Sequence, residues 1–161
     1  MSDADLIIYI FTFLFGISFG SFANVLIYRW PKEESVLGGR SFCGSCGEVI
    51  PWYNNIPVLS YFFLKGKCAN CGRKFSIQYP IVEFITGVLF VWVVSVFGVT
   101  WTALEMLILV YGLLVGSFID WEHMILPDEI TVGGMFIGLI GAALNPDRQF
   151  LDAFLGVLFG G

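Results

Sequence analysis

An aspartate lies at the end of a long apolar run, where an acidic side chain is costly. The run that ends at Ile119 is followed by Asp120, and Pro127 and Asp128 follow within eight residues. Lipid disfavours ionised groups, so a carboxylate at such a depth indicates a functional site. Its chemistry would be proton transfer, as a general acid or base. The alternative is a solvated carboxylate that only ends the span.

One histidine and three further carboxylates follow Asp120 closely. Because residues three apart share a helix face, His123 would lie beside Asp120 if the helix continued. One interpretation is then a metal site on Asp120, Glu122 and His123. The simpler interpretation is a surface histidine with an acidic neighbour. We interpret Glu122, Asp128 and Glu129 as capping or hairpin groups.

Four cysteines occur in two pairs with the spacing of a metal site. Each pair has two residues between its cysteines and a glycine directly after it: Cys43, Cys46 and Gly47, then Cys68, Cys71 and Gly72. Glycine readily adopts the positive φ that such a turn favours. Four thiolates complete a tetrahedral zinc site without an open position, so we predict structural zinc. A redox dithiol or disulfides are the alternatives, and a reducing cytoplasm disfavours disulfides.

The composition is that of a membrane protein. Of the 161 residues, 57% are hydrophobic and 13% are charged, with a mean hydropathy of +0.83. Soluble domains carry about 25% charged residues. The net charge of −5 says little about partners, because the charges are segregated along the chain. We expect a lipid bilayer as a partner, and no nucleic acid.

Long apolar runs predict an all-α integral membrane protein, a polytopic helix bundle. The expected spans are 6–28, 80–99, 101–119, a short glycine-rich fourth span at 130–144, and a fifth that begins at 150. About 20 residues at 1.5 Å each cross a ~30 Å hydrocarbon core. The fifth run stops after about half that length, so we expect an amino-terminal part of a longer protein.

The distribution of basic residues predicts the topology. Seven of the eight Lys and Arg residues lie at positions 29–74. By the positive-inside rule this loop is cytoplasmic. The amino terminus and the turn at 145–149 then lie outside, with Arg148 as a small exception. Counting crossings places Asp120 at the cytoplasmic end of the third span, followed by a polar hairpin at 121–127 on the same side.

Polar and small residues within the first two spans predict helix contacts. Gly16, Gly20 and Ala23 share one face of the first span and allow close approach of another helix. Asn24 should face protein rather than lipid. Glu83, one turn inside the second span, either stabilises the helix amino terminus or has a functional role.

Several motifs occur together in one order, and with them the chain resembles the type IV prepilin peptidases, aspartic proteases of bacterial inner membranes. They are the run Gly20-Ser21-Phe22-Ala23-Asn24, the two cysteine pairs, the run Tyr79-Pro80-Ile81-Val82-Glu83, and Asp120 with Pro127-Asp128. The resemblance covers most of the chain. We expect a first transmembrane helix in 1–30, a cytoplasmic zinc-ribbon-like loop domain in 31–79, and the start of the membrane-embedded peptidase domain in 80–161.

The resemblance implies two activities. One is removal of the basic leader from type IV prepilins or pseudopilins, in pilus assembly or type II secretion. The other is N-methylation of the new amino terminus with S-adenosylmethionine. Asp120 would be one of two catalytic carboxylates. The family's second aspartate belongs to a Gly-x-Gly-Asp motif that this sequence lacks, so we expect the 161 residues alone to be inactive.

Two points stay open at the level of sequence. The residues alone show no methyl-donor pocket, since no glycine-rich nucleotide loop occurs on a strand and helix unit. The alternative function is a non-catalytic membrane module, in which the zinc loop docks a pilus or secretion component and Asp120 is structural.

Overall fold

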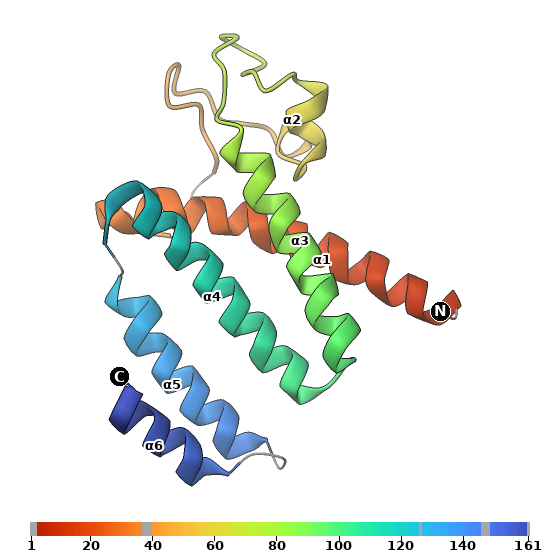
Figure 1. Cartoon of the computed structure of the whole chain (residues 1–161). Coiled ribbons are helices and arrows are strands. Elements are labelled where there is room, and N and C mark those ends of the chain that lie inside the picture. Colours follow the sequence, from red (N-terminus) through yellow and green to blue (C-terminus); the bar gives the residue numbers. More distant parts are fainter. Residues whose placement is uncertain (1–2, 37–39, 126, 146–148, 161) are drawn as a thin grey trace. The chain divides into compact units, whose positions relative to one another are not determined.

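The computed structural model describes residues 3–36, 40–125, 127–145 and 149–160 (Figure 1). Its helices are α1 (Asp3–Arg29), α2 (Leu59–Phe63), α3 (Gln78–Phe97), α4 (Trp101–His123), α5 (Asp128–Leu144) and α6 (Phe150–Gly160), with 3₁₀ turns η1 (Trp30–Lys32) and η2 (Trp52–Asn54). Within these described ranges there is no strand, only two isolated bridges. The all-α prediction is confirmed. Arg148 lies outside the described residues.

Three helices are long and apolar enough to cross a membrane: α1 together with η1, then α3 and α4. They confirm the first three predicted spans. Helix α5 occupies the place of the predicted fourth span, but its 17 residues rise only about 25 Å, less than the bilayer core. Helix α6 has 11 described residues.

Large apolar side chains on these helices point outward. Phe11 on α1 and Trp92 on α3 are 68% and 57% exposed within the chain. A soluble surface does not tolerate a continuous apolar band of this kind, whereas lipid does. The chain is therefore a membrane protein.

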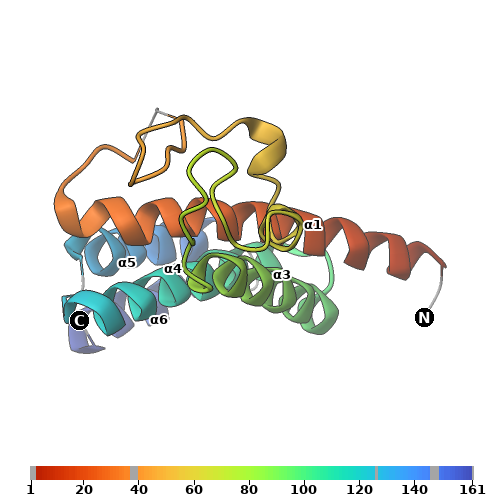
Figure 2. The same ribbon diagram turned by 90° about the horizontal axis from the view of Figure 1, so that it is seen from above.

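Helices α1 and α3 cross at a contact made by small residues (Figures 1 and 2). A Cβ added to Gly20 would lie 2.6 Å from the Glu83 Cα, and one added to Gly16 would lie 2.8 Å from the Gly87 Cα. Ala23 on the same face has no exposed surface. The predicted close-contact face of α1 is confirmed.

Replacing Gly20 by alanine should destabilise this crossing by about 1–3 kcal/mol, because the new methyl group meets backbone that cannot move alone. The matched control is Gly112→Ala on α4, where a Cβ has open space. That change should be neutral or stabilising, since alanine favours helix by about 1 kcal/mol. Thermal unfolding in detergent checks both. Equal midpoints for the two variants would contradict the tight crossing.

The chain divides into two compact units, residues 1–92 and 93–161. In the second unit, Gly98 turns the chain with φ of 66°, and the Thr100 hydroxyl caps α4 by accepting from the Ala103 N–H at 3.2 Å. At the far end, Met124 has φ of 53°, and its N–H donates to the Asp120 carbonyl at 2.8 Å. Asp120 therefore lies in the last turn of α4.

The predicted start of the hairpin at residue 121 is wrong, because α4 continues through His123. The turn that follows is short, since Asp128 already opens α5. Leu126 in this turn lies outside the described residues. At the opposite end of the same helix pair, buried Asn145 donates to the Glu105 carboxylate at 3.3 Å and joins α5 to α4.

Candidate functional site

The loop between α1 and α3 contains two hairpins with the same backbone hydrogen bonds. In the first, the Cys43 N–H donates to the Glu48 carbonyl at 2.9 Å, and the Gly47 N–H donates to the Cys43 carbonyl at 2.8 Å. Cys68 and Gly72 repeat these roles in the second hairpin. Gly47 and Gly72 have φ of 70° and 72°. The positive φ predicted for both glycines is confirmed.

The two hairpins bring the four cysteine sulfurs together. The ligand atoms of Cys43, Cys46, Cys68 and Cys71 all lie within 4.8 Å of one another. Cys43 Sγ and Cys71 Sγ are 3.8 Å apart, about the separation that a tetrahedral site with 2.3 Å Zn–S bonds requires. All four cysteines are free thiols, and no disulfide joins them in this structure. The four cysteines can bind a metal ion.

Backbone N–H groups of the hairpins change the pKa of two of the thiols. N–H groups of Cys46 and Ser45 lower the pKa of the Cys43 thiol to about 6. For Cys71, the Arg73 N–H lowers the pKa, but burial and the neighbouring sulfurs outweigh it and raise the pKa to about 11. A metal ion binds thiolates, so it displaces these protons, and its affinity falls as the pH falls.

Asp120 is exposed at the end of α4, and the alternative metal site around it is absent from the described part of the chain. His123 Nε2 instead lies 3.8 Å from Glu122 Oε2, with both side chains about one third exposed. This pair matches the simpler interpretation of His123. Asp128 is also exposed, in the first turn of α5. Within the described residues, no side-chain hydrogen bond or ion pair is recorded for either carboxylate.

The first unit contains a cavity of about 470 Å³, where the cysteine hairpins meet α1 and α3. Ser21 and Asn24 line it from α1, and Glu83 from α3. Lys67 and Gly66 line it from the second hairpin. This volume lies within the range of about 300–1,000 Å³ that is typical of ligand sites.

Glu83 lines this cavity and is buried, with 8% of its surface exposed. It is the sixth residue of α3, and its carboxylate accepts the Val58 N–H at 2.6 Å rather than stabilising the start of its own helix. The Ser21 side chain also hydrogen-bonds to it. Asn24, 6% exposed, donates to the Tyr79 carbonyl at 3.1 Å, which confirms that it faces protein.

Val58 adopts a backbone conformation that β-branched residues rarely adopt, with φ of 62° and ψ of −52°. The Leu59 N–H donates to the Pro57 carbonyl at 2.6 Å across it, which forms a γ-turn. Such strain costs about 1–3 kcal/mol and persists where surrounding contacts enforce it. Here Glu83 holds the turn. Sequence reasoning missed this contact, because nothing local connects positions 58 and 83.

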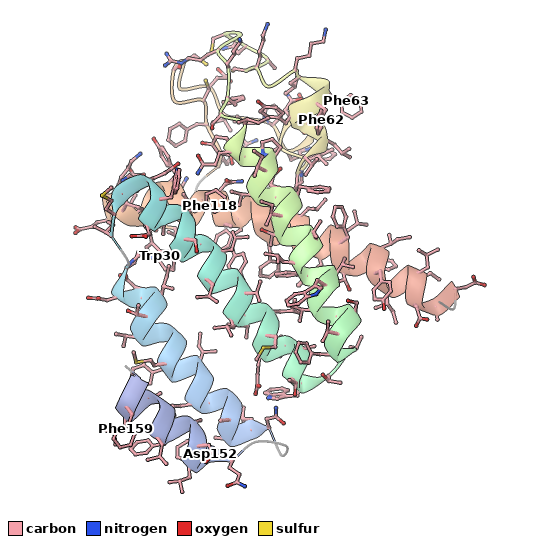
Figure 3. The ribbon with its side chains drawn as sticks, in the orientation of Figure 1. Trp30, Phe62, Phe63, Phe118, Asp152 and Phe159 are labelled. Carbon is pink, nitrogen blue, oxygen red and sulfur yellow. The ribbon has the colours of Figure 1, made fainter. Side chains whose placement is uncertain are left out.

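Short helix α2 exposes two aromatic rings. Phe62 and Phe63 are 69% and 83% exposed, and Figure 3 shows both on α2. Aromatic side chains with this much exposed surface are typical of membrane interfaces and of docking surfaces.

Two family models match this membrane helix bundle with a four-cysteine loop. The one described as "Bacterial Peptidase A24 N-terminal domain" matches residues 14–97, and the one described as "Type IV leader peptidase family" matches residues 107–161. Together they contain the cysteine hairpins, the cavity and the Asp120 turn. The chain belongs to this family of type IV leader peptidases.

Similar proteins carry the name "Prepilin leader peptidase/N-methyltransferase". One from Myxococcus xanthus is 42% identical over 94% of this chain and 45% of its own length. One from Pseudomonas aeruginosa is 36% identical over 92% and 59%, and one from Klebsiella pneumoniae is 40% identical over 93% and 68%. The chain thus spans about half the length of the curated relatives it matches first. No solved structure matches the chain.

Proposed function

We propose that this protein is a membrane aspartic endopeptidase that removes the leader of type IV prepilins or pseudopilins and then N-methylates the new amino terminus. The observation that carries the proposal is Asp120, an exposed carboxylate in the last turn of an apolar helix, inside the segment that matches the leader peptidases. The relatives' names supply both activities.

In cleavage, Asp120 would be one of two carboxylates that share a proton. One takes a proton from the attacking water, and the other, protonated, donates a hydrogen bond to the scissile carbonyl. The water oxygen bonds to the carbonyl carbon, the peptide C–N bond breaks, and the leaving amine receives a proton. We assign no second carboxylate to the described residues. An exposed position suits Asp120, because the substrate chain must reach it.

In methylation, the free amine of the processed substrate would attack the methyl group of S-adenosylmethionine. The methyl carbon leaves the sulfonium, whose electron pair stays on sulfur, and the product ammonium releases a proton. For the metal, we propose one structural zinc ion on Cys43, Cys46, Cys68 and Cys71. The closed set of four thiolates suits structural zinc, and it leaves no position for catalysis.

The setting that we propose is the bacterial inner membrane, with domains as expected from the sequence: helix 1–30, cytoplasmic loop domain 31–79 and peptidase segment 80–161. The basic loop then faces the cytoplasm. The short basic leader of a prepilin would lie on the same side, and so would Asp120 at the end of the third span.

The topology predicts an asymmetric labelling pattern. All four lysines lie in the loop between α1 and α3: Lys32, Lys65, Lys67 and Lys74. A membrane-impermeant amine reagent should leave them unmodified in intact spheroplasts and modify them after permeabilisation. Peptide mass mapping measures this, and the amino-terminal amine serves as the outside control. Lysine labelling in sealed spheroplasts would reverse the assignment.

The test of the function is processing of a prepilin by membranes of cells that express the protein from its complete gene. Mass spectrometry should show loss of the leader and gain of one methyl group at the new amino terminus. A protein that binds pilus or secretion components while leaving the leader intact would instead be the non-catalytic docking module. The exposed Phe62 and Phe63 are the observation that favours that second candidate.

A further inference from the structure

We infer that residues 52–63, which contain η2 and α2, lie in the membrane interface and hold the four-cysteine loop against the lipid headgroups. This segment lies between the membrane helices α1 and α3, within the first unit of the chain. The partner of its exposed face is a lipid surface. The inference rests on α1 and α3 as membrane spans and is independent of both proposed activities.

Helix α2 has its apolar face outward. Phe62 and Phe63 follow Leu59 by three and four residues, so the three side chains share one face of the helix. They are 69%, 83% and 53% exposed, and Figure 3 shows both phenylalanines on the outer side of α2. Ser60 is buried instead, and its hydroxyl donates to the Tyr53 carbonyl at 3.3 Å. A soluble protein turns the apolar face of a helix inward, so this orientation fits a helix that lies on lipid.

A hydrogen bond sets the depth of α2 relative to α3. The Val58 N–H, directly before α2, donates to the Glu83 carboxylate at 2.6 Å. Glu83 is the sixth residue of α3, about 7–8 Å along the helix axis from its start. The 20 residues of α3 rise about 30 Å, which matches the hydrocarbon core, so this bond lies near the boundary of hydrocarbon and headgroups. Interfacial helices lie at this level, with the apolar face about 5–10 Å into the boundary.

At the same level, α3 already exposes apolar side chains. Ile81 and Phe84, which flank Glu83 closely in sequence, are 42% and 52% exposed. On a membrane helix such side chains contact lipid. The lipid that covers them also reaches the level of α2. A partner protein in the cytoplasm would instead need a face that lies beyond the headgroups.

The charges along the loop fit the same placement. Positions 49–64 contain no charged residue, and within them Trp52 and Tyr53 are 78% and 57% exposed. Trp and Tyr are enriched at membrane–water interfaces, which accommodate both an apolar ring and a polar group. Positions 65–74 contain no acidic residue and four basic ones: Lys65, Lys67, Arg73 and Lys74. Basic side chains beside an interfacial segment attract anionic headgroups.

A photoactivatable phospholipid tests the contact directly. The purified full-length protein is placed in nanodiscs of phosphatidylethanolamine and phosphatidylglycerol that include a lipid with a diazirine near the headgroup end of one acyl chain. After illumination, site-resolved peptide mass mapping should find label within 52–64 as well as on α1 and α3, and little on the cysteine hairpins at 41–48 and 67–75. An unlabelled 52–64 segment would overturn the inference. Equal label on the hairpins would also overturn it, because the label would then follow exposure alone.

Two double variants separate lipid contact from folding. In Phe62→Ser with Phe63→Ser, label within 52–64 should fall about tenfold or more, because the apolar surface that partitions into lipid is lost. The matched control is Phe62→Leu with Phe63→Leu, which keeps the apolar face and should keep the label. Neither ring is buried in the chain, so the thermal midpoint in detergent should be the same for both variants. Unchanged label in the serine variant would contradict the assignment to α2.

A crosslinking experiment in whole cells recognises the other occupants of this face. Benzoylphenylalanine in place of Phe63 should form lipid adducts on illumination, and no adduct with protein. An adduct with a second copy of this chain, or with a different protein, would overturn the inference. The second of these results would support the docking module as the role of the exposed rings. Leader cleavage and methylation decide nothing here, since every readout is a contact of the segment itself.

Discussion

Asparagine in place of Asp120 should abolish leader cleavage while it leaves folding and metal content unchanged. An amide can neither take a proton from water nor share one with a second carboxylate. The expected loss is about 10³-fold or more in rate, far above what a boundary residue contributes through stability. Because the Asp120 side chain is exposed and the recorded hydrogen bond of this residue is its own backbone carbonyl accepting from the Met124 N–H, the substitution should disturb no packing. Processing of prepilin by the protein from its complete gene measures the effect.

Asp128→Asn is the matched control for this experiment. Asp128 is also an exposed carboxylate, on the other side of the connection between α4 and α5, and it opens α5. Its loss should weaken the helix start by about 1 kcal/mol or less and leave cleavage largely intact. Methylation of an already processed pilin should survive both changes. Normal cleavage by Asp120→Asn, or loss of cleavage in Asp128→Asn alone, would move the catalytic role away from Asp120.

Local patterns predicted much of the fold. The face of Gly16 and Gly20 predicted a close helix contact, because small residues four apart necessarily share one side of a helix. The spacing of the cysteine pairs predicted both tight turns, since each turn is formed by consecutive residues. In these cases the sequence distance is short, and the geometry follows from it.

What the sequence did not predict depends on contacts between distant residues. The Val58 N–H meets the Glu83 carboxylate across 25 positions, and Asn145 meets Glu105 across 40. No repeating spacing in the sequence connects the two members of either pair, so neither contact could be predicted. The cavity is lined by residues between positions 18 and 83 that are far apart in the sequence, so the residues alone did not show it. The end of α4 was also misplaced, because the polar residues after Asp120 suggested a hairpin although the helix continues.

Replacing Cys43 by serine should remove the metal from the loop domain. Cys43 is the most buried of the four ligands, with 1% exposed surface. It is also the thiol whose pKa the backbone N–H groups lower to about 6, so it is deprotonated near neutral pH. Serine keeps the size but not the thiolate that zinc prefers. Purified protein should fall from about one zinc per chain to nearly none.

The matched control for this change is Ser45→Ala, between the two cysteines of the same hairpin. Ser45 contributes its backbone N–H to the environment of Cys43, and alanine keeps that N–H. Zinc content should therefore stay near one per chain. The same pair separates a metal-dependent fold from a redox dithiol, since a dithiol protein would contain no zinc before or after either change.

Loss of the metal should destabilise the loop domain and leave the membrane helices unchanged. The two hairpins are short, and within the described residues each has one isolated bridge. Because such short hairpins bury little apolar surface of their own, we expect a bound metal ion to hold them together. Amide exchange should rise in 40–77 for Cys43→Ser and stay unchanged at the α1 and α3 crossing, whose contacts are independent of the sulfurs. Full protection of both hairpins without metal would show that side-chain packing, not zinc, holds this domain.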